Sequence, residues 1–231
     1  MTTIASRLQA VRARVADAAR LHGRNPDDIS LLAVSKTWPA DAVREARAAG
    51  QRCFGENYVR EGLAKISALA DPGLEWHFIG PLQSNKSADV ARAFAWLHSL
   101  DRLKLAQRLS VQRPPTLPAL NVCIQVNVSG EASKSGVAPQ ALDALVDRLV
   151  ELPGLRLRGL MCVPEPSADE ALLRRRFAGL RERLEALNAR GFALDTLSMG
   201  MSHDLDAAIA EGATIVRVGT AIFGERVYPR P

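Results

Sequence analysis

Lys36 is the residue best placed for covalent chemistry. It ends the apolar run of residues 31–35, which is typical of a buried strand. An amine at the end of such a strand lies against walls of low dielectric constant. Because desolvation disfavours the ammonium form, the free amine becomes a better nucleophile toward a carbonyl. The competing interpretation is a lysine that reaches solvent from a strand end, and position alone favours it.

A second group of residues is typical of a phosphate site. The segment SMGMSHD (198–204) leads from a strand-like run into the helical pattern DLDAAIAEG, with Ser202 or Asp204 as its N-cap. The last strand-like run ends in residues that offer a fixed charge, a close backbone approach and a hydroxyl: Arg217, Gly219 and Thr220. Helix N-termini after such segments bind phosphate, although ordinary caps and turns remain the alternative.

A carbonyl-reactive amine and a phosphate site together predict a ligand that carries an aldehyde and a phosphate. Pyridoxal 5'-phosphate meets both demands. The phosphorylated sugars that aldolases bind meet them too. The two features alone therefore leave both ligand classes open.

Eight strand-like runs alternate with helical patterns along the chain. The runs are residues 31–35, 52–55, 76–79, 96–100, 120–128, 155–163, 194–199 and 214–219. Parallel neighbours need long crossovers, so eight βα units in about 200 residues predict an α/β fold, a single (β/α)8 barrel of the TIM type over residues 1–231. The competing open dinucleotide-binding sheet needs a G-x-G-x-x-G turn after its first strand, and the sequence has none there. In a barrel, site residues lie at the C-terminal ends of strands.

Two further segments carry expectations about the barrel. Residues 1–22 have apolar side chains at helical spacing and predict a helix packed on the barrel, although their many arginines leave a transit peptide open. In residues 120–128 the alternation places Cys123 and Asn127 on the inward face. Asn127 is then either a site residue at the mouth or a cap of the next turn.

Composition excludes several classes of protein. With 47% hydrophobic and 24% charged residues, the chain is neither disordered nor a disulfide scaffold. Its net charge of +5 comes from scattered arginines without interleaved aromatic residues, which argues against a nucleic-acid partner. Three separated cysteines and four histidines predict no metal centre and a reducing, cytoplasmic setting. No apolar run is long enough for a membrane span, and no extended apolar strip predicts an oligomer, so we expect a monomer.

Seven long segments, spread over nearly the whole chain, carry a further signal. They are LLAVSKT (31–37), CFGENYVREG (53–62), WHFIGPLQSNK (76–86), SKSG (133–136), LRLRGLMCVP (155–164), SMGMSHD (198–204) and VRVGTAIFG (216–224). Together they closely resemble the pyridoxal phosphate homeostasis protein family. That family's fold resembles the N-terminal barrel of alanine racemase, the type III fold of pyridoxal phosphate proteins.

The resemblance implies a role for individual residues. Lys36 corresponds to the lysine that forms a Schiff base with pyridoxal 5'-phosphate, and Lys134 to a lysine of a mobile loop. The residues implied to surround the phosphate are Ser198, Ser202, Arg217, Gly219 and Thr220. Those implied to lie near the ring are Asn57, His77 and Met199.

The resemblance also implies a function in vitamin B6 homeostasis without established turnover, hence no catalytic residues. Other B6 vitamers and apo-enzymes that use the cofactor are further implied partners. The alternative is an amino-acid racemase, which uses two opposed bases, one of them a tyrosine from an additional β-domain. We expect no such domain here, and Tyr58 and Tyr228 are the two tyrosines of the chain. A basic interaction protein with the barrel as scaffold is the third hypothesis.

Overall fold

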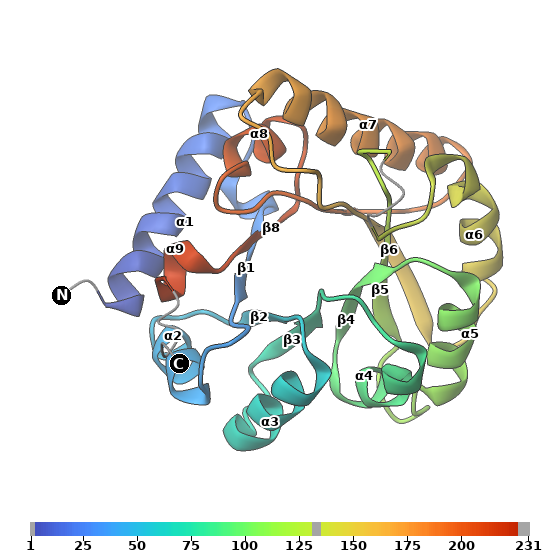
Figure 1. Ribbon diagram of the computed structural model, residues 1–231, viewed down its shortest axis with the longest axis horizontal. Coiled ribbons are helices and arrows are strands. Elements are labelled where there is room, and N and C mark those ends of the chain that lie inside the picture. The colour runs from blue at the N-terminus through green and yellow to red at the C-terminus, as the bar shows by residue number, and fades with distance from the viewer. Residues whose placement is uncertain (1–2, 131–134, 226–231) are drawn as a thin grey trace, which may run out of the picture.

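The computed structural model describes residues 3–130 and 135–225. Eight parallel strands close into a barrel in chain order, with β8 pairing back to β1 (Figure 1). The strands are β1 (Ser30–Val34), β2 (Cys53–Glu56), β3 (Glu75–Phe78), β4 (Trp96–Leu100), β5 (Leu120–Gln125), β6 (Leu155–Met161), β7 (Thr196–Ser198) and β8 (Ile215–Val218). The predicted (β/α)8 barrel is confirmed.

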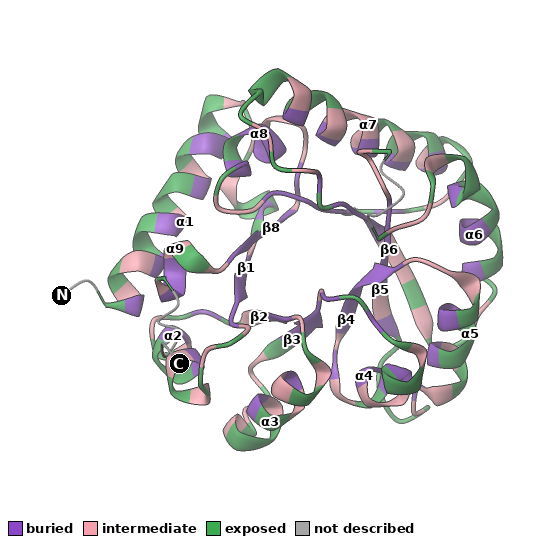
Figure 2. Cartoon of the chain, viewed as in Figure 1, coloured by how far each residue is buried: buried purple, intermediate pink, exposed green. Residues whose placement is uncertain are grey.

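Helices surround the barrel and turn their buried faces toward it (Figure 2). They are α1 (Ile4–Leu21), α2 (Ala40–Ala48), α3 (Val59–Leu69), α4 (Ser87–Ala93), α5 (Leu103–Gln112), α6 (Leu142–Leu149), α7 (Glu170–Ala189), α8 (Leu205–Ala210) and α9 (Thr220–Phe223). Short 3₁₀ turns lie at η1 (Pro26–Asp28), η2 (Ser84–Lys86) and η3 (Pro139–Ala141). None of these helices is long and apolar enough to cross a membrane, within the ranges given above.

Four strands are shorter than the sequence predicts: β8 loses one residue at each end of the run 214–219, and β5, β6 and β7 differ more. The runs 120–128, 155–163 and 194–199 end as strands at Gln125, Met161 and Ser198. The residues that follow, among them Val126, Cys162 and Met199, stay buried although they have left the strands. The apolar pattern therefore continues into segments at the mouth of the barrel, and it marks burial there rather than strand pairing.

Neighbouring residues of each strand face opposite sides of the barrel wall. On β3, Trp76 and Phe78 pack in the main core between strands and helices, whereas His77 faces the lumen and stacks on Trp96. A separate lumen cluster joins Trp96, Cys123 and Met161, so the prediction that Cys123 faces inward is confirmed. Since branched apolar residues usually fill a TIM barrel, a histidine in the lumen is unusual.

Helix α1 docks on the barrel as predicted. Its buried face includes Leu8 and Val11, and it packs against α8, α9 and α2 (Figure 1). Its arginines also bind backbone carbonyls: Arg14 Nη1 donates to the carbonyl of Ser202 at 2.8 Å, and Arg7 Nε donates to that of Ile222 in α9 at 2.6 Å. The helix therefore supports the segments that follow β7 and β8.

Candidate functional site

A cavity of about 310 Å³ opens at the C-terminal ends of the strands. Six of the predicted residues line it: Lys36, Asn57, Ser202, Arg217, Gly219 and Thr220. They follow or end β1, β2, β7 and β8, the end of the barrel where the fold predicts a site. The volume lies in the range of small-molecule sites.

Two lysines lie near the mouth, and their surroundings differ. The ammonium of Lys65, on α3, donates to the carbonyl of Ser35 at 2.6 Å, to Glu56 Oε1 at 2.7 Å and to Glu61 Oε1 at 2.6 Å. Only 4% of Lys65 is exposed. An ammonium whose three N–H groups are engaged has no lone pair for a carbonyl. Lys36 lines the cavity, where a ligand can reach its side chain.

The same buried cluster fixes the turn that carries Lys36. The backbone N–H of Thr37 donates to the Glu61 carboxylate, and Ser35 Oγ donates to Glu56 Oε1 at 2.6 Å. Thr37 has φ of 69°, the left-handed region that β-branched residues rarely adopt. Such strain persists where surrounding contacts hold it. The residues on both sides of Lys36 are therefore clamped, and the i,i+4 spacing of Glu61 and Lys65 was the one sequence signal of this cluster.

Asn57 gives the clearest sign that the cavity is built for a ligand. Its Oδ1 is buried and has no hydrogen-bond partner, a property that it shares only with Glu56 Oε2 among the residues that the structure describes. A Cβ at Gly80 would lie 2.2 Å from the carbonyl oxygen of Asn57, so the two backbones pack too closely for any side chain at position 80. A buried acceptor without a partner is costly unless a ligand satisfies it.

The predicted phosphate side of the cavity combines hydroxyls with close backbone packing. Gly219 precedes α9, and a Cβ there would lie 3.1 Å from the carbonyl oxygen of Val34. Thr220 is the first residue of α9. Asp204, one of the two predicted caps, takes the N-cap position of α8, but its side chain makes no capping hydrogen bond to the helix. Its Oδ1 instead accepts the backbone N–H of Met201 at 2.6 Å.

Arg217 lies deeper, two residues before Gly219 on β8. Its guanidinium donates to Ser198 Oγ at 2.7 Å and to the carbonyl of Cys162 at 2.7 Å. Only 4% of the residue is exposed, and burial lowers its pKa from the usual value. The side chain contributes to the floor of the cavity and is fixed from below.

Three predicted residues lie outside the cavity lining. Ser198 is beneath Arg217, and its Oγ also contacts His98 Nδ1 at 2.7 Å. His77 lies further down the lumen, where its Nδ1 contacts His98 Nε2 at 2.9 Å. Met199 is fully buried in the main core, because it alternates with the lumen-facing Ser198. Lys134 lies outside the described residues.

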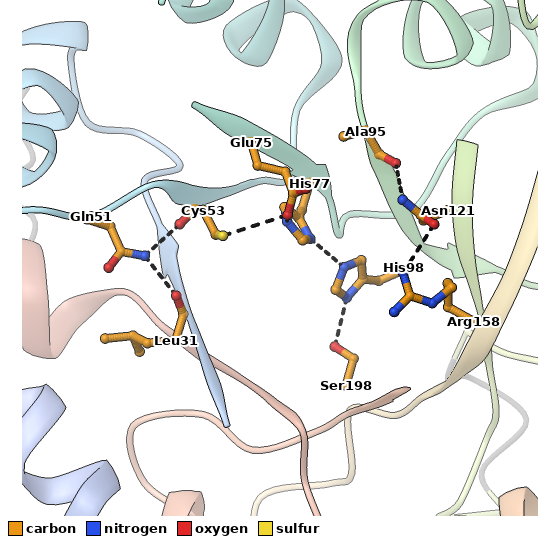
Figure 3. A network of polar contacts seen from close by, with 10 residues as sticks. All are labelled: Leu31, Gln51, Cys53, Glu75, His77, Ala95, His98, Asn121, Arg158 and Ser198. Atoms are coloured by element: carbon orange, nitrogen blue, oxygen red, sulfur yellow. Dashed lines mark hydrogen bonds and ion pairs between the residues drawn. The ribbon is translucent and has the colours of Figure 1, made fainter. Parts of the chain in front are cut away.

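These lumen residues form a continuous polar chain (Figure 3). His77 Nε2 contacts Glu75 Oε1 at 2.9 Å, at the opposite end of the barrel from the cavity. Burial lowers the pKa of His77 and, more strongly, that of His98, and so disfavours the charged form of both rings. One set of tautomers satisfies every contact, with each group donating to the next from Arg217 through Ser198 and the two imidazoles to Glu75.

Other interpretations from the sequence are settled by local contacts. Asn127 Oδ1 accepts the backbone N–H groups of Ser129 and Gly130, at 3.3 and 3.1 Å, and caps the turn after β5. Tyr58 is 57% exposed and is not among the residues that line the cavity. Trp38 does line it, beside Phe223 at a ring distance of 6.0 Å, and sequence reasoning missed it although it follows Lys36 by two residues.

Known proteins match this chain over nearly its whole length. The family model described as alanine racemase, N-terminal domain, matches residues 6–227. A pyridoxal phosphate homeostasis protein of Pseudomonas aeruginosa is 62% identical over 231 residues, which cover 100% of this chain and 99% of that protein. The chain belongs to the pyridoxal phosphate homeostasis protein family. The resemblance seen in the sequence is thereby confirmed.

Solved structures of similar proteins agree with this family and its fold. The structure of PipY from Synechococcus elongatus PCC7942, with PLP bound, is 41% identical at a TM-score of 0.80 and covers 91% of this chain and 100% of PipY. Alanine racemase from Corynebacterium glutamicum is 17% identical at a TM-score of 0.66, over 93% of this chain and 60% of the racemase. The racemase shares the barrel fold with this member of the homeostasis family.

Proposed function

We propose that this protein binds pyridoxal 5'-phosphate at the barrel mouth and holds it reversibly on Lys36, as part of vitamin B6 homeostasis. The observation that carries the proposal is the buried, unpartnered Oδ1 of Asn57 in the same cavity as the reachable amine of Lys36. The PLP-bound relative PipY supports the choice of this ligand over a sugar phosphate.

The residues present fit the cofactor. When bound, pyridoxal 5'-phosphate supplies an aldehyde, to which a primary amine bonds reversibly, and a phosphate dianion. Lys36 provides the amine, and Asn57 Oδ1 accepts a hydrogen bond from the bound ligand. Ser202, Gly219 and Thr220 provide hydroxyl and backbone donors for the phosphate, since they share one side of the cavity.

Arg217 and its support complete the proposed site. The guanidinium keeps a positive charge beneath the cavity, and Ser198 acts through it by accepting its hydrogen bond. His77 and Met199 are assigned no direct contact with the cofactor, because they line the lumen and the core instead. The apolar side chains of Val34, Ile79 and Val163 exclude water from the rest of the cavity.

We further propose that the protein stores or delivers the cofactor without turnover, in the cytoplasm. A racemase needs a second base opposite the lysine. Among the described residues of the lining, the titratable side chains besides Lys36 are Arg217, which is pinned by buried acceptors, and His203, which is exposed. Other B6 vitamers and apo-enzymes are the proposed further partners, and the protein acts as a monomer.

Borohydride trapping tests the attachment site. The purified protein is mixed with pyridoxal 5'-phosphate and then reduced with borohydride. We expect the peptide that contains Lys36 to carry the added mass of a pyridoxyl group. Lys36→Ala abolishes this adduct, whereas Lys104→Ala, which alters an exposed lysine of α5, retains it. An adduct that persists in Lys36→Ala contradicts the assignment.

Exchange of the substrate α-proton tests the absence of turnover. The cofactor-loaded protein is incubated with amino acids in deuterated water, and incorporation of deuterium at Cα is followed by NMR. We expect none above the rate with free cofactor. Exchange that depends on Lys36 supports the racemase alternative instead.

A further inference from the structure

Three metal-ligating side chains meet at the end of the barrel opposite the cavity. Cys53 begins β2 and Glu75 begins β3, where the two are register partners, and His77 lies on the same face two residues further on. Cys53 Sγ is 3.7 Å from Glu75 Oε1, and His77 Nε2 is 2.9 Å from the same oxygen (Figure 3). One ligand atom from each of the three residues lies within 4.8 Å of the others.

Two of the three separations are close to those of a zinc site. Tetrahedral Zn²⁺ with Zn–S of about 2.3 Å and Zn–N or Zn–O of about 2.0–2.1 Å places its ligand atoms roughly 3.3–3.6 Å apart. The distances of 3.7 Å from Cys53 Sγ to Glu75 Oε1 and 2.9 Å from His77 Nε2 to the same oxygen depart from this spacing by a few tenths of an ångström. Thiolate, imidazole and carboxylate are also the ligand types that zinc prefers.

The ligands are held in place from outside. The other nitrogen of His77 contacts His98 Nε2 at 2.9 Å, and the ring stacks on Trp96 with an interplanar angle of 6°. Metal-bound histidines use such a contact to fix their orientation. On the other side, Gln51 Nε2 donates to the backbone carbonyls of Cys53 at 2.8 Å and Leu31 at 2.7 Å (Figure 3).

We propose that Cys53, Glu75 and His77 bind a divalent zinc ion at the base of the barrel, with a water molecule as the fourth ligand. Glu75 is 46% exposed and provides the path of entry. The Cys53 thiol gives its proton to solvent and becomes the thiolate ligand. His77 binds through Nε2, so its single proton moves to Nδ1 and is donated to His98 Nε2. The His98 proton moves in turn to its Nδ1, which donates to Ser198 Oγ. Neither ring gains or loses a proton, so each ion releases the one proton of the thiol.

The site is independent of the proposed function, since it shares no residue with the cavity lining. Sequence spacing predicts no metal centre because Cys53 and Glu75 are 22 positions apart. Strand register makes them neighbours, which the spacing alone does not show.

Competitive zinc titration tests the proposal on tag-free protein, both free of pyridoxal 5'-phosphate and loaded with it. Zn²⁺ is added in the presence of a chromogenic chelator, and proton release is followed in weak buffer. We expect one ion per chain with micromolar or tighter affinity and one proton released, in both forms. Absence of binding in this range overturns the proposal.

Variants locate the ligands. Since loss of an outer contact already weakens metal sites by about 10–100-fold, we expect Cys53→Ser to weaken binding by at least about 100-fold and Glu75→Gln by at least about 10-fold. Cys162→Ala, which removes a buried thiol elsewhere, leaves the affinity unchanged.

Cobalt provides a readout that is independent of stability. The Co²⁺-loaded protein shows a thiolate-to-cobalt charge-transfer band, which Cys53→Ser removes while circular dichroism stays unchanged. Zinc affinity retained in Cys53→Ser, or lost in His203→Ala at the mouth, overturns the assignment to the base of the barrel.

Discussion

The two ends of this barrel present polar groups in different ways. At the mouth, Asn57 Oδ1 is buried without a partner and Lys36 faces a cavity. At the base, His77 and Glu75 satisfy each other, and the chain of contacts continues through His98. The mouth therefore suits a ligand that makes new hydrogen bonds, whereas the base can take only a cation that replaces protons already present.

The comparison shows that polarity alone does not identify a ligand site. His77 resembles a site residue in the sequence, yet its partners are other side chains. Asn57 is no more polar, but its buried oxygen lacks a partner, and the residue lines the cavity. What distinguishes the two is whether the protein itself satisfies the group.

The largest expected effect comes from Lys65→Met, which removes the support of the mouth. Glu56 is then buried without its cation, and breaking such a pair costs about 3–5 kcal/mol. We expect urea unfolding at lower concentration and loss of borohydride-trapped cofactor, since the Ser35 carbonyl loses its donor. Lys104→Met, on the exposed face of α5, retains both properties.

The same variant carries a pH dependence. Burial already raises the pKa of Glu56, and Lys65 opposes that rise. Without Lys65 the folded-state pKa lies further above the unfolded value, so the protonated carboxyl stabilises the fold at low pH and this stability is lost as pH rises through the folded pKa. The loss in free energy of unfolding, relative to the unmodified protein, therefore grows from mildly acidic to alkaline pH. A loss in free energy of unfolding that is constant with pH contradicts this account.

The next largest effect is a loss of cofactor affinity when the Arg217 charge or the Thr220 hydroxyl at the mouth is removed. A charge-assisted hydrogen bond contributes roughly 1.5–3 kcal/mol, so Arg217→Gln or Thr220→Ala weakens cofactor affinity by about one to two decades. Because Lys36 is untouched, borohydride still traps the cofactor at saturation. Equilibrium dialysis measures the affinity. Unchanged values in both variants remove these residues from the site.

A smaller effect is expected from the helix that supports the mouth. Arg14→Ala removes the hydrogen bond to the Ser202 carbonyl, and since the side chain is partly exposed, we expect cofactor affinity to fall about threefold to tenfold. Arg20→Ala on the same helix is the control, because Arg20 pairs with Asp17 of α1 itself. Equal effects of the two variants contradict a specific role for Arg14.

The smallest effect tests whether the two ends act separately. In Glu75→Gln the amide oxygen still accepts the proton of His77 Nε2, so the direction of the lumen chain is preserved. We expect cofactor affinity to change by less than about threefold, under ~1 kcal/mol. A tenfold change shows that the chain through Ser198 and Arg217 couples the base to the mouth.

The barrel and most of the mouth could be predicted from the sequence. Alternating apolar patterns mark eight βα units, and residues that follow strands must gather at one end of a parallel barrel. For that reason Lys36 and the segments after β7 and β8 could be placed near one another, and the structure brings Lys36, Ser202 and Thr220 to one cavity.

Which polar residues face the cavity, and which satisfy one another, could not be predicted, because it depends on how the segments pack together. Strand register brings Cys53 beside Glu75, and barrel closure brings His98 to Ser198 across 100 positions of sequence. The Lys65 cluster likewise depends on how α3 docks against β2. Periodicity reports burial along one segment, but contacts between segments follow from register and closure, and these depend on the packing of the whole chain.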